Sequence, residues 1–152
     1  MRVLILVPLW LHVVGIVVWL GGVVYQAHGL LPAARGGDAA TFADAARRQR
    51  PIAWTALSLV VLTGFYNVTR LGPLEHVMES GAGLILAGKF ILVLIVVAIA
   101  AQRDFTHLVR LRLSLTTGAD PLPILTAIAR IDRLTIVLGV IIIYLGLAIS
   151  RS

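Results

Sequence analysis

Four long stretches of the chain are almost purely apolar, and short polar segments separate them. They cover roughly residues 3–31, 51–71, 83–103 and 123–150. A helix needs about 20 apolar residues to cross a bilayer, so each stretch is long enough to span one. Proline lies at or just beyond the ends of the first two stretches and just before the fourth, at Pro32, Pro73 and Pro121. The pattern predicts an all-α integral membrane protein, a four-helix bundle in which residues 1–152 form a single transmembrane domain.

The polar segments between the predicted spans also carry helical signals. The first connection, residues 33–50, is basic, and its centre favours a helix that lies at the membrane interface. Pro51 follows it and suits the first turn of the second span. After the third span the helical pattern continues from Gln102 to Leu115, and a turn follows at residues 116–121.

Arginine is distributed unevenly between the two sides of the predicted bundle. The first and third connections and the nearby start of span four hold Arg35, Arg47, Arg48, Arg50, Arg103, Arg110, Arg112, Arg130 and Arg133. The opposite side has Arg2, Arg70 and Arg151, with Lys89 nearby. Positive loops stay in the cytoplasm, so we expect an N-out/C-out protein, with both termini in the periplasm if it is bacterial. Asp132 is then expected at the cytoplasmic interface, where it offsets a neighbouring arginine.

The composition narrows the classes of function. The chain is 59% hydrophobic, and its mean hydropathy is +0.99. Because the arginines behind the net charge of +6 lie between apolar runs, they indicate membrane topology and a lipid partner, with no nucleic acid. There is no cysteine, which excludes disulfides, thiolate metal sites, iron–sulfur clusters and covalently attached haem. No catalytic residue set is predicted, because neither a Ser/His/Asp pattern nor a phosphate-binding glycine loop is present.

One face of the first span carries the residues that are unusual in a membrane helix. At 100° per residue, the same sector holds His12, Gly15, Trp19, Gly22 and Gln26. His12 lies nine residues into the span, about 13 Å deep and close to the middle of the hydrocarbon layer. We expect this face to point into the bundle, where His12 either hydrogen-bonds a neighbouring helix or binds a ligand.

Three further residues are candidates for ligand binding inside the bundle or at its edges. Lys89, about 9 Å into span three, either extends its ammonium to the outer interface or faces inward beside His12. His107 is 18 residues, or five turns, beyond Lys89 on the same stripe. His28 is expected at a similar inner depth, so the two histidines either lie in interfacial water or pair as axial haem ligands.

A fourth histidine lies in the second connection. His76 is flanked by Glu75 and Glu79, which can share one helical turn with it. This spacing favours either a solvated loop or an entry site for a metal ion such as copper.

Several short motifs in this order are typical of one group of membrane proteins. They are Leu11-His12, Trp19-Leu20-Gly21-Gly22, Thr63-Gly64 with Asn67, Lys89, and Gln102-Arg103. The chain resembles the CopD family of bacterial inner-membrane proteins and, more distantly, HemJ-type protoporphyrinogen oxidases. CopD-like proteins are linked to copper uptake or resistance, and HemJ-like proteins to a b-type haem. A first-span histidine and a third-span lysine recur in both, so the resemblance implies roles for His12 and Lys89.

Three functions are compatible with these residues. A copper-handling protein would use His12 and His76 as metal ligands. A b-type haem protein would draw its cofactor-binding residues from His12, Lys89, His28 and His107, and any enzymatic activity would be that of a haem-dependent oxidoreductase. An accessory subunit would bind no cofactor and would pack against a larger membrane complex or further copies of this chain.

Overall fold

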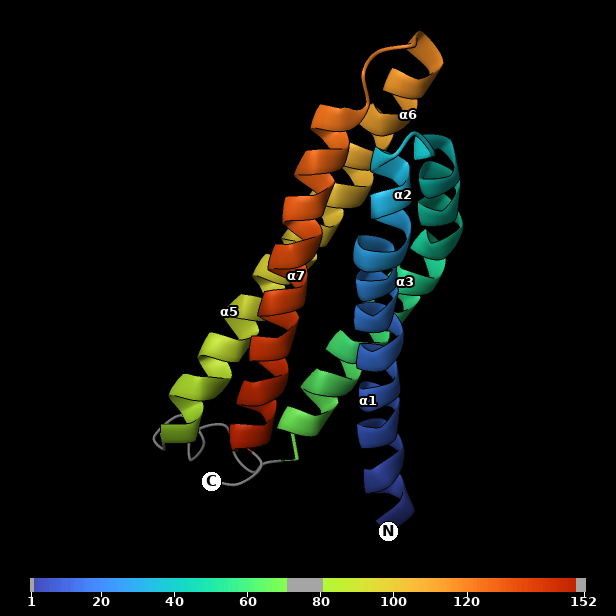
Figure 1. Ribbon diagram of the computed structural model, residues 1–152. Helices are drawn as coiled ribbons and strands as arrows, with labels where there is room; N and C mark the ends of the chain where they lie inside the picture. Colours follow the sequence, from blue (N-terminus) through green and yellow to red (C-terminus); the bar gives the residue numbers. More distant parts are fainter. Residues whose placement is uncertain (1, 71–80, 150–152) are drawn as a thin grey trace.

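The computed structural model describes residues 2–70 and 81–149, and long helices make up almost all of this part (Figure 1). In chain order these are α1 (Arg2–Tyr25), η1 (Gln26–Leu30), α2 (Leu31–Arg35), α3 (Ala39–Val68), α5 (Gly81–Gln102), η2 (Arg103–His107), α6 (Leu108–Thr117) and α7 (Leu122–Ile149). The elements η1 and η2 are single π-helical turns that join the helices on either side of them. Within the described residues, four continuous helical stretches are long and apolar enough to cross a membrane. The predicted all-α, four-span fold is confirmed.

The helices pack as two pairs that meet at one end of the bundle. Helix α1 runs along α3, and α5 runs along α7 (Figure 1). The first turn of α1 and the last turn of α7 lie at the same end of the bundle, which we call the terminal end. The opposite end holds α2, the start of α3 and all of α6, and we call it the arginine-rich end. An even number of spans explains why the chain begins and ends on one side, whereas the side that faces the cytoplasm stays a prediction.

Helix α3 differs from the sequence-based expectation. Residues 39–50 are not a separate interfacial helix, and Pro51 is not in a first turn, because one 30-residue helix begins at Ala39 and contains Pro51. The Asp38 side chain caps it by accepting a hydrogen bond from the Thr41 backbone N–H at 3.4 Å. Buried Phe42 anchors the added turns in the core, and this packing outweighs the cost of an internal proline. The helix bends along its length, as a proline inside a helix allows (Figure 1).

The ends of the other helices follow from local chemistry. The first span continues past Leu31 to Arg35, because Pro32 occupies the first turn of α2, where no backbone N–H is needed. The helix after the third span continues as predicted but extends to Thr117, two residues beyond the expected end at Leu115. Gly118 ends it in the left-handed conformation, with φ of +72°, which a glycine adopts without steric cost.

Two apolar clusters form the described core. The first, at the arginine-rich end, joins α2, α3, α6 and α7 through residues that include Phe42, Leu111, Leu125 and Ile128. The second, in the middle of the bundle, joins α1, α3 and α5 around Trp19, Ala56, Leu57 and Val96. Many apolar side chains point outward instead, such as Leu62 and Leu84, which are 68% and 82% exposed. This outer apolar surface is what a lipid environment requires.

Gly15 sets the distance between α1 and α3. A Cβ added there would lie 2.8 Å from Val60 Cγ2 and 3.2 Å from the Ala56 carbonyl oxygen. Gly15→Val should therefore push the helices apart and lower the free energy of unfolding by about 1–3 kcal/mol. Gly21→Val is the matched control, because no atom lies within 4 Å of a Cβ built at that position. Unfolding in detergent would compare them, and equal stability would show that α1 and α3 do not meet at Gly15.

Candidate functional site: two polar levels in the bundle

His12 lies at an interhelical contact in the half of the bundle nearest the terminal end. Its Nδ1 is 2.9 Å from Thr63 Oγ1 on α3, and the ring is half-buried. Gly64 faces the edge of the ring, because a Cβ added there would lie 3.2 Å from His12 Cε1. His12 therefore faces inward, as expected, and the hydrogen bond to a neighbouring helix, one of its two expected roles, is present; ligand binding stays a prediction.

The hydroxyl of Thr63 is placed to accept a hydrogen bond from the His12 ring. Thr63 Oγ1 donates to the Leu59 carbonyl at 2.6 Å, so it can accept from Nδ1 when the neutral ring carries its proton there. In a neutral imidazole the other nitrogen, Nε2, then carries a free lone pair, the form in which histidine binds metals.

Lys89 lies near the same level as His12. Its ammonium approaches α7 at Gly146, where an added Cβ would be 3.0 Å from Nζ. The side chain is half-buried. The helices α1, α3, α5 and α7 therefore each contribute one of His12, Thr63, Lys89 and Gly146 to this part of the bundle.

A second polar level lies nearer the arginine-rich end, where Arg103 is 8% exposed and Asp132 is fully buried. Arg103 Nε donates to Asp132 Oδ1 at 2.5 Å, and its Nη2 donates to Asp132 Oδ2 at 3.2 Å. The two parallel bonds form the bidentate pair that a guanidinium and a carboxylate favour. Nη1 donates to Asp104 at 3.1 Å, and Nη2 also donates to Gln26.

This network reaches all four membrane-crossing stretches. Gln26 on η1 donates to Gln49 Oε1 on α3 at 2.7 Å, and Trp54 on α3 donates to Asp104 Oδ2 at 2.8 Å. Gly22 leaves the room that Gln49 occupies, since a Cβ at Gly22 would lie 2.1 Å from Gln49 Nε2. A buried charge is tolerated only when it is paired and hydrogen-bonded, and this arrangement meets that condition.

Both π-helical turns begin at this network. Gln26 opens η1, and Arg103 with Asp104 opens η2. A π-turn inserts an extra residue into the helix and rotates the side chains beyond it, and such turns occur frequently at functional sites. Here they bring the amide of Gln26 and the guanidinium of Arg103 together.

The chain matches the model of a known protein family. A family model described as copper resistance protein D, CopD, matches residues 43–149. The chain belongs to the CopD family. Neither the curated proteins nor the solved structures contain a match. Membership makes the chain a membrane protein of copper resistance or handling, and the match includes Thr63, Lys89 and Arg103, whereas His12 precedes it.

The remaining described histidines of this CopD protein, His28 and His107, each contact a backbone carbonyl of their own helical stretch. His28 is exposed, and its Nδ1 lies 3.2 Å from the Val24 carbonyl of its own helix. His107 is half-buried, with Nδ1 3.2 Å from its own helix at the Gln102 carbonyl. His76 lies outside the described residues. Within the part that is described, no three His, Cys, Asp or Glu side chains gather closely enough to hold a metal ion.

The expected partner of Asp132 was wrong. Asp132 does not offset an arginine next to it in sequence but is buried between the helices and pairs with Arg103, 29 residues away. The sequence does contain a signal for this pair. Arg103 lies on the stripe of Lys89 and buried Val96, and a charge on the inward stripe of a helix requires a partner.

An apolar layer separates the two polar levels. His12 and Gln26 are 14 residues apart on one helical stretch, which corresponds to about 21 Å along the axis. The cluster around Trp19 fills the space between them. His12 therefore belongs to a site that is distinct from the Arg103 network.

Proposed function

We propose that this CopD protein takes up copper through the membrane and that His12 Nε2 is a copper ligand on that path. Imidazole nitrogen is a suitable ligand for copper. The predicted N-out orientation puts His12 in the outer half of the bilayer, so copper from outside would reach it first.

The hydrogen bond between His12 and Thr63 is the observation that carries this proposal. A metal-binding histidine usually donates its other ring N–H to a partner that fixes the tautomer and the ring orientation. Thr63 fulfils this role because its own proton is committed to the Leu59 carbonyl at 2.6 Å. A histidine that served packing alone would not need Nε2 to be free.

The surroundings of His12 favour a site that releases copper readily over a site that stores it. Conduction requires a site that binds strongly enough for the ion to enter and weakly enough for it to leave. A single imidazole is a weak anchor, and the nearby Lys89 ammonium would repel a copper cation held at Nε2. The accompanying ligands would then be water or groups that exchange readily.

Copper titration of the purified protein tests the proposal directly. Protein in detergent is titrated with Cu(II), and separately with Cu(I) kept reduced by ascorbate, in competition with a chromophoric chelator. We expect one copper ion per chain and a colourless protein before titration. A Soret band in the purified protein would show that the bound cofactor is haem and would contradict the copper proposal. A protein that binds neither copper nor haem would support the accessory-subunit alternative.

Thr63→Val should weaken copper binding by about 10- to 100-fold, the usual effect of removing a hydrogen-bond partner from a metal-binding histidine. Valine keeps the shape of threonine but cannot accept the Nδ1 proton, so the tautomer and the ring orientation are no longer fixed. Thr55→Val, at an exposed position on the same helix, is the matched control. Equal affinities in the two variants would contradict the role of Thr63.

A further inference from the structure

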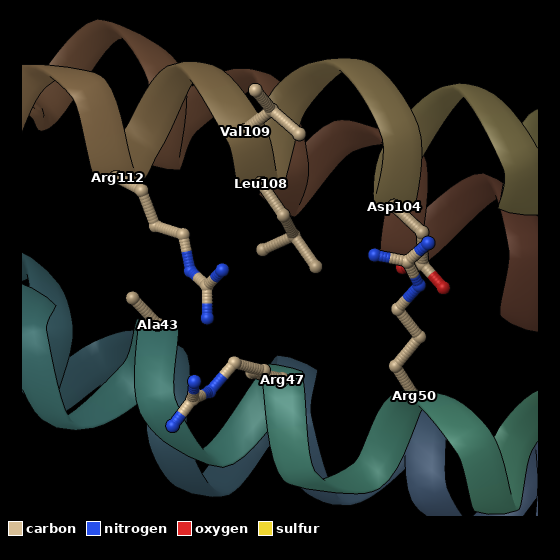
Figure 2. Close-up of a pocket in the computed structure, with 7 residues that line it drawn as sticks. All are labelled: Ala43, Arg47, Arg50, Asp104, Leu108, Val109 and Arg112. Carbon is tan, nitrogen blue, oxygen red and sulfur yellow. The ribbon is translucent and has the colours of Figure 1, made fainter.

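A pocket of unusual charge opens between α3 and α6 at the arginine-rich end (Figure 2). Its lining consists of Ala43, Arg47, Arg50, Asp104, Leu108, Val109 and Arg112. In Figure 2 the side chains of Arg47 and Arg112 extend towards each other across the gap, and that of Arg50 extends towards Asp104. Buried Ala43 and Leu108 give the pocket an apolar floor.

The one carboxylate in this pocket is already engaged. Asp104 Oδ1 accepts from Arg103 at 3.1 Å, and Oδ2 accepts from Trp54 at 2.8 Å. In the part of the chain that the structure describes, the ion pairs within 4.0 Å all belong to Arg103. Arg47, Arg50 and Arg112 all line this pocket, and among the described residues no carboxylate lies within ion-pair distance of them. The three pocket arginines carry a charge of +3. The neighbouring Arg103, Asp104 and Asp132 together carry −1, so these six residues have a net charge of +2.

Aromatic side chains hold one of these arginines in place. The guanidinium carbon of Arg50 lies 4.2 Å from the centre of the Phe105 ring, a cation–π contact. Phe105 in turn packs against Trp54, with ring centres 5.8 Å apart. A guanidinium that is fixed in this way loses less entropy when it binds an anion.

One end of the pocket lies at the depth of lipid headgroups. Apolar sequence begins just after Arg50 on α3 and ends at Ala101 on α5, so these residues mark the edge of the hydrocarbon layer. The headgroup region of one leaflet is about 5–8 Å thick. At 1.5 Å per residue, Arg47 lies about 5 Å beyond the edge and within this region, whereas Arg112 lies about 16 Å beyond it, on the water side. Exposed Phe105, about 6 Å beyond the edge, lies at the headgroup end of the pocket.

We propose that this pocket binds the phosphate of an anionic phospholipid. Three guanidinium groups supply the paired donors that phosphate oxygens accept, and the apolar floor suits the glycerol backbone below a headgroup. A soluble phosphate offers the same oxygens but not the apolar part, and the position beside the hydrocarbon edge favours the lipid. The inference does not depend on the proposed copper path, because Asp104 in this pocket belongs to the Arg103 network, which the apolar cluster around Trp19 separates from His12.

Native mass spectrometry of the full chain in detergent tests the proposal, with phosphatidylglycerol, phosphatidylcholine and inorganic phosphate as probes. We expect one tightly held phosphatidylglycerol and much weaker retention of phosphatidylcholine. The triple variant Arg47→Gln/Arg50→Gln/Arg112→Gln should lose about 100-fold in phosphatidylglycerol affinity, since each arginine near an anionic lipid contributes a factor of about five. The single variant Arg112→Gln changes an exposed position and should lose about fivefold in phosphatidylglycerol affinity. It replaces the triple variant in this test if the triple variant does not fold.

The control variant Arg48→Gln/Arg110→Gln/Arg130→Gln removes the same charge from exposed positions outside the pocket. It should retain the affinity of the unmodified chain. Equal losses in both triple variants would overturn the proposal and indicate attraction by overall charge alone. Displacement of phosphatidylglycerol by inorganic phosphate would also overturn it, because the ligand would then be a soluble anion.

Discussion

Asp132→Ala should lower the free energy of unfolding by about 3–5 kcal/mol, the usual cost of removing one partner of a buried ion pair. The guanidinium of Arg103 would stay inside the bundle and lose both bonds to the fully buried carboxylate. Asp104 and Gln26 would still accept from it, but neither can replace the bidentate contact. Asp132→Asn should cost less, because the amide keeps one acceptor oxygen in place.

Unfolding of the purified variants by SDS, followed by circular dichroism, measures this effect. Asp44→Ala is the matched control, since it removes the same charge from an exposed position on α3. The double variant Arg103→Ala/Asp132→Ala should be less destabilised than the sum of the two single variants, because the residues are in contact. If Asp132→Ala and Asp44→Ala were equally stable, Arg103 and Asp132 would not be paired in the membrane.

His12→Ala should abolish copper binding while leaving the fold intact. The substitution removes the proposed ligand, and Thr63 keeps its own hydrogen bond to the Leu59 carbonyl. The expected structural cost is therefore one hydrogen bond of about 1 kcal/mol. Copper uptake into vesicles that contain the purified protein should fall to the level of empty vesicles.

His28→Ala provides the comparison for this experiment. It also removes one histidine from the first helical stretch, but His28 is exposed and bonds to its own helix. Its copper affinity should match that of the unmodified chain. If His28→Ala lost copper and His12→Ala retained it, the ligand would have to be sought at the arginine-rich end and our proposed path would be wrong.

The inward face of the first span could be read from residue spacing. Periodicity of 3.6 residues placed His12, Trp19 and Gln26 together, and in the structure Trp19 is 7% and Gln26 5% exposed. Such predictions succeed because a helix fixes the angles between its own side chains. The partners of these residues on other helices, Thr63 and Gln49, could not be read in the same way.

The charged residues show where sequence reasoning reached its limit. Arg103 follows the apolar run that ends at Ala101, and Asp132 precedes the apolar run that begins at Leu134. Such positions are typical of the membrane interface. Their pairing depends on how α5 and α7 are rotated and shifted against each other, and on the π-turn that begins at Arg103. The continuous helix through Pro51 likewise depends on core packing of Phe42 and not on the local preference of proline.

The sequence by itself determined that this protein is helical, that it crosses the membrane four times and which face of the first helix turns inward. Hydropathy and helical period suffice for these properties, because each depends on one segment and its solvent. Only the tertiary structure decided that Thr63 meets His12, that Asp132 meets Arg103 and that three arginines line one pocket between α3 and α6. Contacts of this kind join residues about 20 to 80 positions apart in sequence, and they depend on the packing of whole helices, which no local pattern records.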